Sequence, residues 1–573
     1  MIPPTPLSVL DDDLARLGSR RAAWARLPLP DKIARLVRLR DRVDAAAEGW
    51  VRAAAHAKGL APDSPLVGEE WISGPWAMLY TINALESTLK AVERGRLRRL
   101  VDGKTRTRPD GRLVVDVFPA TASDALLLNG YTAEVWMQRG VTDETLVDTM
   151  ATSYREPSPG EPPPTGGVAV VLGAGNIASI PPLDVLHMLY TEGYVALLKL
   201  NPVNEYLGPV FETVFGEFIA DGFLSVAYGG ADVGEHLTRH AGVDLIHVTG
   251  SAATHDAIVY GTGAEGARRK AADAPAIETP VTSELGGVTP VVVLPGDWSE
   301  PDLTFQAEHV ATMKLHNGGY NCIGAQVLVL PEAWPQRAAF LAALREALAD
   351  LPERAPYYPG SDDRLAAARA AADRSETFGG RLLLHVDASR ADAPAFREEV
   401  FGPALVVTTL PGATPQAFLD AAVHFCNRTL AGTLGMTILG HPSTLDALGD
   451  GLDDAIERLR YGTVGVNVWS GAGFLLPQAA WGAAPGHTRA DIGSGTGTVH
   501  NALLFSRPEK TVVRGPFAPF PRTLVTGRPH LSPKPPWFVT NRTAAETAEK
   551  LTRFAADPSP TRIPGLFASA LRG

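Results

Sequence analysis

Cysteine is scarce in this sequence, which holds only Cys322 and Cys426 among its 573 residues. Two thiols so far apart do not look like a disulfide framework, so we expect a protein of a reducing compartment, the cytoplasm. An excess of basic charge is also missing, because the formal net charge at pH 7 is −11. That balance argues against nucleic acid as the main partner.

Long apolar runs and metal-ligand spacings are absent as well. No apolar run reaches the ~18 residues that a membrane-spanning helix needs. The N-terminal residues Met1–Pro4 do not begin a basic region followed by an apolar run, so we expect no signal peptide. The 14 histidines show no spacing typical of a metal site. We therefore expect a globular protein with no membrane span and no metal.

The order of apolar and amphipathic segments predicts an α/β protein. After a helical N-terminal part, short apolar strands at residues 168–172, 195–200, 225–228 and 245–248 alternate with helical patterns. A second series begins near residue 290, with strands at 290–294, 327–330, 382–385 and 404–408. Such alternation is typical of parallel sheets with helices on both faces. These sheets bind ligands beyond the carboxyl ends of their strands.

The turn Asn317–Cys322 is a candidate catalytic site. Gly318 and Gly319 break the helical pattern there, and glycine lets the backbone come close to a ligand. A thiol on such a turn can be aimed into a cleft and activated as a nucleophile. The alternative is that Cys322 is a small apolar filler. Cys426 lies in a helical pattern, and we expect it in the core.

Four other loops lie at strand ends or at the join between the two series: Leu172–Asn176, Lys199–Pro202, Val248–Ser251 and Glu284–Gly287. A glycine or a lysine at the end of a strand is common, so each loop alone is a weak signal. Together with Cys322 they indicate a single site at one edge of a parallel sheet.

The order of these motifs resembles that of the aldehyde dehydrogenase superfamily. The series is Lys-x-Asn-Pro, Thr-Gly-Ser, Glu-Leu-Gly-Gly, Asn-x-Gly-x-x-Cys and then Glu-Val-Phe-Gly-Pro at Glu399–Pro403. The resemblance extends more loosely from about residue 20 to about residue 500. It implies a Rossmann-type cofactor domain, an α/β catalytic domain and a small β oligomerisation arm.

The resemblance also implies roles for individual residues, and the chemistry agrees. Cys322 would be the nucleophile that forms a thiohemiacetal and then a thioester with an aldehyde. Asn176 and the backbone N–H of Cys322 would bind the oxyanion, and Glu284 would deprotonate the water that releases the acid. NAD or NADP would accept the hydride. The residues expected to bind this cofactor are Lys199, Asn201, Pro202, Gly230, Thr249, Gly250, Ser251, Leu285, Gly286, Glu399 and Phe401.

The resemblance predicts a division of the chain into three parts. Residues 1–110 and 155–286 would form the cofactor-binding domain, and residues 287–490 the catalytic domain. Residues 111–154 and 491–573 would form the oligomerisation arm and a C-terminal extension. The strand at 112–119 is similar to the arm through which family members pair, and Leu503–Phe505 could add to a partner's sheet. We therefore expect a homodimer or homotetramer.

The sequence departs from the family at positions that leave the substrate and the cofactor open. Ala174-Gly175 replaces a Pro-Trp pair beside Asn176, and Pro202 replaces the carboxylate that many NAD-dependent members place there. Without that carboxylate a 2′-phosphate meets less repulsion, so we expect NADP to be accepted. Oxidation of an aldehyde to an acid is preferred because Glu284 supplies a base. The alternatives are reduction of an acyl-CoA or other acyl thioester through the same cysteine, and a catalytically silent scaffold.

Overall fold

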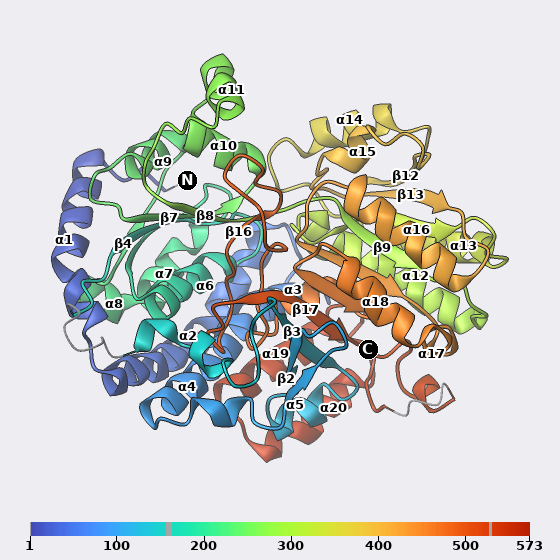
Figure 1. Ribbon diagram of the computed structural model, residues 1–573, viewed down its shortest axis with the longest axis horizontal. Coiled ribbons are helices and arrows are strands. Elements are labelled where there is room, and N and C mark those ends of the chain that lie inside the picture. Colours follow the sequence, from blue (N-terminus) through green and yellow to red (C-terminus); the bar gives the residue numbers. More distant parts are fainter. Residues whose placement is uncertain (1, 156–162, 526–529) are drawn as a thin grey trace.

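The computed structural model describes residues 2–155, 163–525 and 530–573 (Figure 1). Two sheets organise this part of the chain. A six-stranded sheet has the order β16-β8-β7-β4-β5-β6, and an eleven-stranded sheet has the order β1-β2-β3-β17-β15-β14-β9-β10-β13-β12-β11. The predicted α/β class is confirmed. Residues 156–162, at the expected boundary before the cofactor-binding domain, lie outside the described residues.

The six-stranded sheet is parallel apart from one short strand. Its strands are β4 (Val168–Leu172), β5 (Val195–Lys199), β6 (Leu224–Ala227), β7 (Leu245–Gly250), β8 (Val281–Leu285) and β16 (Gly495–Thr496). β16 pairs antiparallel with β8, so a segment from the far end of the sequence closes this edge. The strands β4 and β5 are almost wholly buried, which explains why they read as continuous apolar runs.

The larger sheet has a parallel core, with an antiparallel strand at one edge and the arm at the other. The parallel strands are β9 (Thr289–Val293), β10 (Ala325–Pro331), β12 (Arg381–His385), β13 (Ala404–Leu410), β14 (Gly435–Leu439), β15 (Thr463–Val466) and β17 (Pro508–Arg514). β11 (Arg374–Phe378) pairs antiparallel with β12. The strands expected at 290–294, 327–330, 382–385 and 404–408 are β9, β10, β12 and β13.

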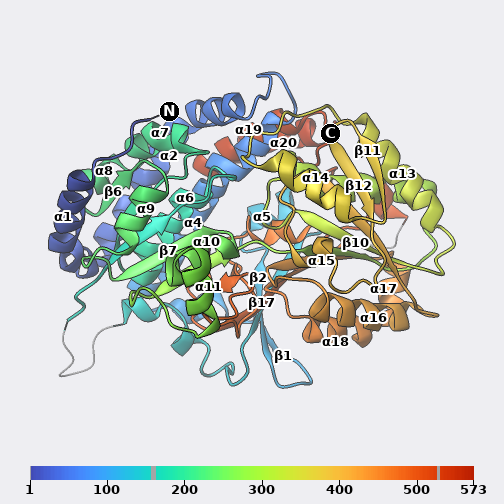
Figure 2. The same ribbon diagram turned by 90° about the horizontal axis from the view of Figure 1, so that it is seen from above.

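The arm joins the larger sheet of its own chain. It consists of β1 (Thr105–Thr107), β2 (Leu113–Phe118) and β3 (Thr132–Met137), and its hairpin projects from the body in Figure 2. β17 pairs antiparallel with β3 on one side and parallel with β15 on the other. One C-terminal strand therefore makes the arm continuous with the parallel strands.

The expectation that Leu503–Phe505 adds to a partner's sheet is wrong. Phe505 forms a β-bridge with Met150, and the backbone N–H of Ala151 donates to the carbonyl oxygen of Leu504. The segment is buried within its own chain, because Leu503 and Phe505 pack in the cluster that includes Val115 and Val135, while Leu504 packs in the larger core cluster. The backbone groups of Leu504 and Phe505 are thus paired within the chain.

The helices cover both sheets, and the C-terminal part packs on the N-terminal part. They are α1 (Leu7–Ala25), α2 (Leu29–Ala57), α3 (Val67–Trp71), α4 (Ala77–Glu93), α5 (Ala122–Leu127), α6 (Ile180–Leu186), α7 (Gly208–Val214), α8 (Gly216–Ala220), α9 (Ala231–Thr238), α10 (Ala252–Tyr260), α11 (Gly263–Ala271), α12 (Glu300–Leu315), α13 (Arg337–Asp350), α14 (Ser361–Ala371), α15 (Pro394–Arg397), α16 (Pro415–Arg428), α17 (Pro442–Leu448), α18 (Asp450–Arg458), α19 (Ala544–Ala556) and α20 (Ile563–Ala570). α19 contacts α2, α3 and α4, so the tail covers a surface of its own chain (Figure 2).

Candidate active site

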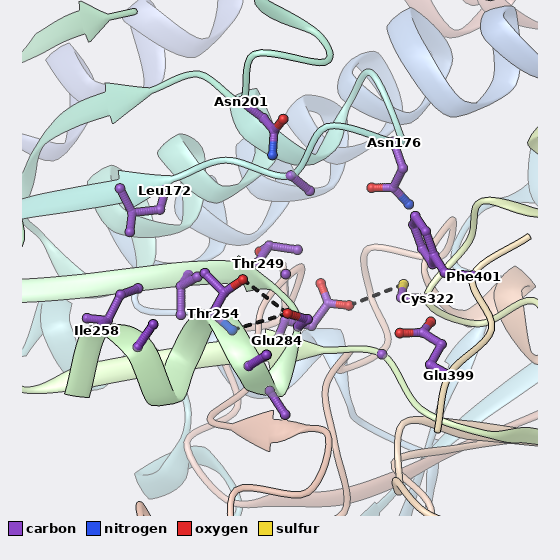
Figure 3. Close-up of a pocket in the computed structure, with 18 of the residues that line it drawn as sticks. Leu172, Asn176, Asn201, Thr249, Thr254, Ile258, Glu284, Cys322, Glu399 and Phe401 are labelled. Carbon is purple, nitrogen blue, oxygen red and sulfur yellow. Dashed lines mark hydrogen bonds between the residues drawn. The ribbon is translucent and has the colours of Figure 1, made fainter. Parts of the chain in front are cut away.

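A cavity of about 910 Å³ lies where the carboxyl ends of the strands in the smaller sheet face the larger sheet. Leu172, Lys199 and Gly250 line it from the ends of β4, β5 and β7, and Glu284 from the end of β8. Cys322, Glu399 and Phe401 line the opposite side (Figure 3). The cavity is therefore at the place where a parallel α/β sheet holds its ligand.

A strained turn aims Cys322 into this cavity. α12 begins at a side-chain cap, since Ser299 accepts from the backbone N–H of Asp302, and it ends at Leu315. The chain then reverses through left-handed residues, with φ of 68° at Gly318 and 89° at Gly319. A Cβ on Gly319 would lie 2.7 Å from the carbonyl carbon of Gly402, so a side chain there would push the backbone apart.

The side chains of Cys322 and Glu284 both line this cavity and form a hydrogen bond with each other. The Cys322 thiol donates to Oε1 of Glu284 over 3.6 Å (Figure 3). Burial, together with the nearby Glu284 and Glu399 carboxylates, raises the pKa of the thiol well above its usual value. Burial and the charge of Asp184 raise the pKa of Glu284 as well. The thiol thus keeps its proton at neutral pH and has a carboxylate beside it that can take the proton.

Asn176 is held against the same turn. Its side-chain nitrogen donates to the carbonyl oxygen of Tyr320 over 2.9 Å. Its own carbonyl oxygen accepts from Lys58 Nζ over 3.2 Å and from the side-chain nitrogen of Asn317 over 3.0 Å. Lys58 also forms a buried ion pair with Glu70 over 2.8 Å. These bonds tie the loop after β4 to the cysteine turn.

Glu399 and Phe401 lie on a loop fixed by Arg364. The Arg364 guanidinium donates to the carbonyl oxygen of Val400 over 2.9 Å and to that of Phe401 over 3.3 Å. Burial raises the pKa of Glu399 to about 8. Its Oε1 has no hydrogen-bond partner among the described residues, although it is buried. A Cβ on Gly286 would lie 2.4 Å from that atom, so glycine permits the close approach.

The rest of the cavity has the features of a dinucleotide site. The N-terminus of α10 opens onto it, and Ser251 caps this helix by accepting from the backbone N–H of Thr254 over 3.1 Å. Free backbone N–H groups at such a terminus suit a pyrophosphate. Lys199 supplies a cation whose pKa is lowered by burial and raised by Asp232. With Glu399 Oε1 unpaired and able to accept from a ribose hydroxyl, the residues fit a nicotinamide dinucleotide.

Comparisons of the sequence point to one superfamily. A profile of the aldehyde dehydrogenase family matches residues 200–362. N-succinylglutamate 5-semialdehyde dehydrogenase 1 of Caulobacter vibrioides is 32% identical over 239 residues, which are 37% of this chain and 45% of that protein. Coniferyl aldehyde dehydrogenase of a Pseudomonas species is 26% identical over 286 residues, which are 46% and 54%. The matched stretch of this chain is thus similar to members of the aldehyde dehydrogenase superfamily.

Solved structures show that the chain has the aldehyde dehydrogenase fold. The NADP complex of the NADP-dependent glyceraldehyde-3-phosphate dehydrogenase from Bacillus halodurans aligns with a TM-score of 0.58 at 17% identity, covering 89% of this chain and 92% of that one. An NAD-dependent aldehyde dehydrogenase from Sinorhizobium meliloti aligns with a TM-score of 0.57 at 17% identity, covering 91% and 89%. The predicted fold is confirmed, whereas the sequence alignments span about half the length of the curated relatives.

The structure gathers most of the expected site residues around one cavity. Cys322, Glu284, Asn176, Lys199, Asn201, Gly230, Thr249, Gly250, Ser251, Gly286, Glu399 and Phe401 all line it. Pro202 and Leu285 do not. Pro202 is exposed at the turn after β5, and Leu285 follows Glu284 on its strand, so its side chain points to the opposite face of the sheet and is buried.

Four residues outside the sequence motifs hold or influence the site residues, and the sequence alone did not predict them. Lys58, Glu70, Arg364 and Asp232 lie far from Cys322 in the sequence, and each is part of an ordinary helical or loop pattern. The resemblance gave no signal for them. Among the residues that the structure describes, no helix is long and apolar enough to cross a bilayer.

A second, smaller cavity of about 50 Å³ meets the main one at Cys322. Most of its lining is apolar, and the large side chains are Ile72, Ile177, Ile180, Ile323, Trp469, Phe474, Leu475, Trp481 and Trp537. Trp537 comes from the C-terminal tail, which the sequence analysis did not connect with the site. No lysine, arginine, aspartate or glutamate contributes to the lining of this smaller cavity.

Proposed function

We propose that this protein oxidises an aldehyde to a carboxylic acid with NAD or NADP, by way of a thioester on Cys322. The observation that carries the proposal is the contact of 3.6 Å between the Cys322 thiol and Glu284 Oε1. Both groups face a cavity that fits a dinucleotide and meets an apolar cavity at the sulfur. That arrangement suits a nucleophile with its base beside it, between a cofactor and a substrate.

The first step uses the proton that the thiol still holds. Glu284 accepts this proton as the sulfur attacks the carbonyl carbon, which forms a thiohemiacetal. The second N–H of the Asn176 amide and the backbone N–H of Cys322 donate to the oxygen on which charge develops. The bond from Asn176 to the Tyr320 carbonyl sets the orientation of that amide.

The next step makes the thioester. A bound nicotinamide dinucleotide supplies the acceptor for the hydride that leaves the thiohemiacetal carbon. In this proposal the protein positions that group with Glu399 and Phe401 at one end and with Lys199 and the N-terminus of α10 at the other. Water then attacks the thioester, and Glu284 takes one of its two protons. The other proton passes from the departing acid to the sulfur, so the carboxylate leaves and the thiol is restored.

The smaller cavity suggests the class of substrate. Its lining of tryptophan, phenylalanine and isoleucine offers no ion pair to a charged group, and transfer of a charge into such surroundings is costly. We propose an aldehyde with a compact apolar substituent. The relative from Caulobacter vibrioides is named for N-succinylglutamate 5-semialdehyde, an aldehyde that carries charged groups, so this proposal differs from that substrate.

A panel of aldehydes with NAD and NADP, each with and without coenzyme A, tests the proposal. We expect reduced cofactor and free acid without coenzyme A, and apolar aldehydes should give the highest kcat/KM. Cys322→Ala should abolish turnover while cofactor affinity stays near that of the wild type. Product formation only as an acyl-CoA, or only in the reverse direction from an acyl thioester, would establish the reductase instead. A Cys322→Ala variant with a tenth of the wild-type rate would contradict the assigned nucleophile.

A further inference from the structure

Three buried titratable residues lie beside Glu284 and have no part in the steps above. Asp184 is on α6, His247 on β7, and His500 in the loop after β16. Their exposed fractions are 0%, 1% and 4%. None of the three lines either of the cavities at Cys322, so they lie behind the wall rather than in the site.

These residues form a chain of close polar contacts. His500 Nε2 lies 3.6 Å from Asp184 Oδ1, and His247 Nε2 lies 3.7 Å from Asp184 Oδ2. Thr249 Oγ1 donates to Asp184 Oδ2 over 2.9 Å. The two histidines hold the pKa of Asp184 below its usual range in spite of its burial. Asp184 therefore stays a carboxylate that lies between the two imidazoles.

The inner end of this chain reaches Glu284. Thr249 on β7 is the direct cross-strand neighbour of Glu284 on β8. The charge of Asp184 raises the pKa of Glu284, and His500 lowers it, which places both within electrostatic reach. Glu284 Oε2, Asp184 Oδ1 and both ring nitrogens of His500 are buried with no hydrogen-bond partner among the described residues. Buried polar atoms gathered in this way are usually satisfied by water, which also passes protons.

The outer end of this series of polar contacts reaches the surface. His247 Nδ1 lies 2.9 Å from Thr282 Oγ1, and Thr282 is only half-buried. Glu192, whose side chain is 45% exposed, is the further charged group that acts on His247. No group of three histidine, cysteine or acidic residues in the described ranges could hold a metal ion, so a metal site does not explain the cluster.

The proposed reaction requires a route by which protons leave Glu284. Oxidation of an aldehyde consumes one water and releases the carboxylate, the reduced cofactor and two protons. One proton comes from the thiol and one from the water, and both pass to Glu284. A cofactor and a substrate held in the two cavities would lie on the cavity side of this carboxyl group, so the protons would need another way out.

We propose that His500, Asp184, His247 and Thr282 form a proton path that discharges Glu284 to solvent. The inference rests on the proposed function. Protonated Glu284 gives its proton to His500, whose second ring proton moves toward Asp184 and is taken up by His247. His247 gives its Nδ1 proton to the Thr282 hydroxyl oxygen, and the hydroxyl proton goes to water. No bond to carbon or sulfur changes, and no oxidant is needed.

The test removes one imidazole from the path by substitution and then supplies free imidazole from solution. His500→Gly should give a burst of one reduced cofactor per site followed by a steady rate at least tenfold below that of the wild type. Imidazole should restore the steady rate, and substituted imidazoles should do so in the order of their pKa values. Thr282→Val, at the outer end, should lower the steady rate and increase the solvent isotope effect on kcat. His309→Gln is the matched control, because His309 is also buried but packs on Phe538 away from the site.

The outcomes separate the path from the reaction itself. Wild-type rates in both His500→Gly and Thr282→Val, with turnover still dependent on Cys322, would overturn the path alone. A slow His500→Gly variant that imidazole does not restore would show that His500 is structural and would also overturn it. If Cys322→Ala turns over like the wild type, the proposed function fails and the path fails with it.

Discussion

The ammonium group of Lys58 donates to the side-chain oxygen of Asn317 over 2.9 Å, which ties the end of α2 to the turn that carries Cys322. The same ammonium donates to the Asn176 carbonyl and pairs with Glu70. One cation thus fixes the distance between the two loops that are proposed to supply the nucleophile and the oxyanion donor. The side chains of Lys58 and Glu70 are 2% and 0% exposed, so water cannot replace either partner.

Lys58→Met should lower both stability and kcat. Loss of the cation leaves Glu70 as a buried, unpaired charge, a change that costs about 3–5 kcal/mol. Urea unfolding measures that loss, and the double variant with Glu70→Gln should regain part of the stability while kcat stays at least tenfold low. Lys32→Met is the control, since Lys32 is buried against Trp24 and Tyr154, away from the cavity. A double variant with wild-type kcat would show that the pair serves stability alone.

Glu284→Gln should make an acyl-enzyme accumulate. The amide cannot take a proton from water, so a burst of reduced cofactor should precede a steady rate at least a hundredfold lower. Rapid-mixing absorbance and mass spectrometry of the quenched protein measure the burst and the thioester. Imidazole should not restore this variant, in contrast to His500→Gly. An unchanged steady rate without a burst would assign deacylation to another base or favour the thioester reductase.

Glu399→Gln should change how stability depends on pH between 5 and 8. The pKa of Glu399 is raised to about 8 in the fold, against an ordinary value of 4.5, so the folded state binds this proton more tightly than the unfolded state does. The contribution of this protonated carboxyl group to the free energy of unfolding is fully present below pH 4.5 and is lost as the pH rises toward 8. Glutamine does not titrate, so the variant does not lose this contribution. Between pH 5 and pH 8 its free energy of unfolding should therefore gain roughly 2–4 kcal/mol relative to that of the wild type. Urea unfolding at pH 5 and pH 8 measures this difference. Equal pH dependence of the two proteins would contradict it. Lys314, with a pKa lowered to about 8, acts mainly above this window.

Charges near Lys199 should set the preference between NAD and NADP. Asp232 acts on Lys199, and its carboxylate repels a 2′-phosphate. Asp232→Asn should raise the ratio of kcat/KM for NADP over NAD by about fivefold or more. Pro202→Glu should lower this ratio by a factor that corresponds to roughly 1 kcal/mol. We predict that the wild type accepts NADP at an efficiency comparable to or better than that with NAD. A wild-type preference for NAD of about a hundredfold, roughly 2.7 kcal/mol, would show that another group selects the cofactor.

The protein is predicted to form at least a dimer. The three-residue strand β1 is an edge of the larger sheet and is mostly exposed, so its backbone is the part of the arm that remains open to pairing. Light scattering at micromolar concentration measures the mass. A monomer under those conditions would contradict the prediction and would fit the pairing of the arm with its own sheet.

The sequence was informative where a signal is local. The apolar runs at 168–172 and 195–200 became β4 and β5 within one residue, and the Gly-Gly break before Cys322 became a left-handed turn that faces the cavity. It was uninformative where a contact joins distant segments. Lys58 lies 259 residues from Asn317, and the helix that precedes it is an ordinary amphipathic one. Asp184, His247 and His500 likewise come from three separate elements that only the folded chain brings together.

The position of β17 has a consequence for how the chain is made. β17 lies between β15 and β3, so a growing chain has already produced the strands on both sides before residue 508 is added. Until then β3 and β15 each present unpaired backbone groups, the kind of edge that joins to other chains. Chains that end before residue 508 should therefore aggregate rather than fold as a shorter enzyme. The strand of this sheet that is synthesised last is therefore the one that covers the open edges of β3 and β15 and prevents them from pairing with other chains.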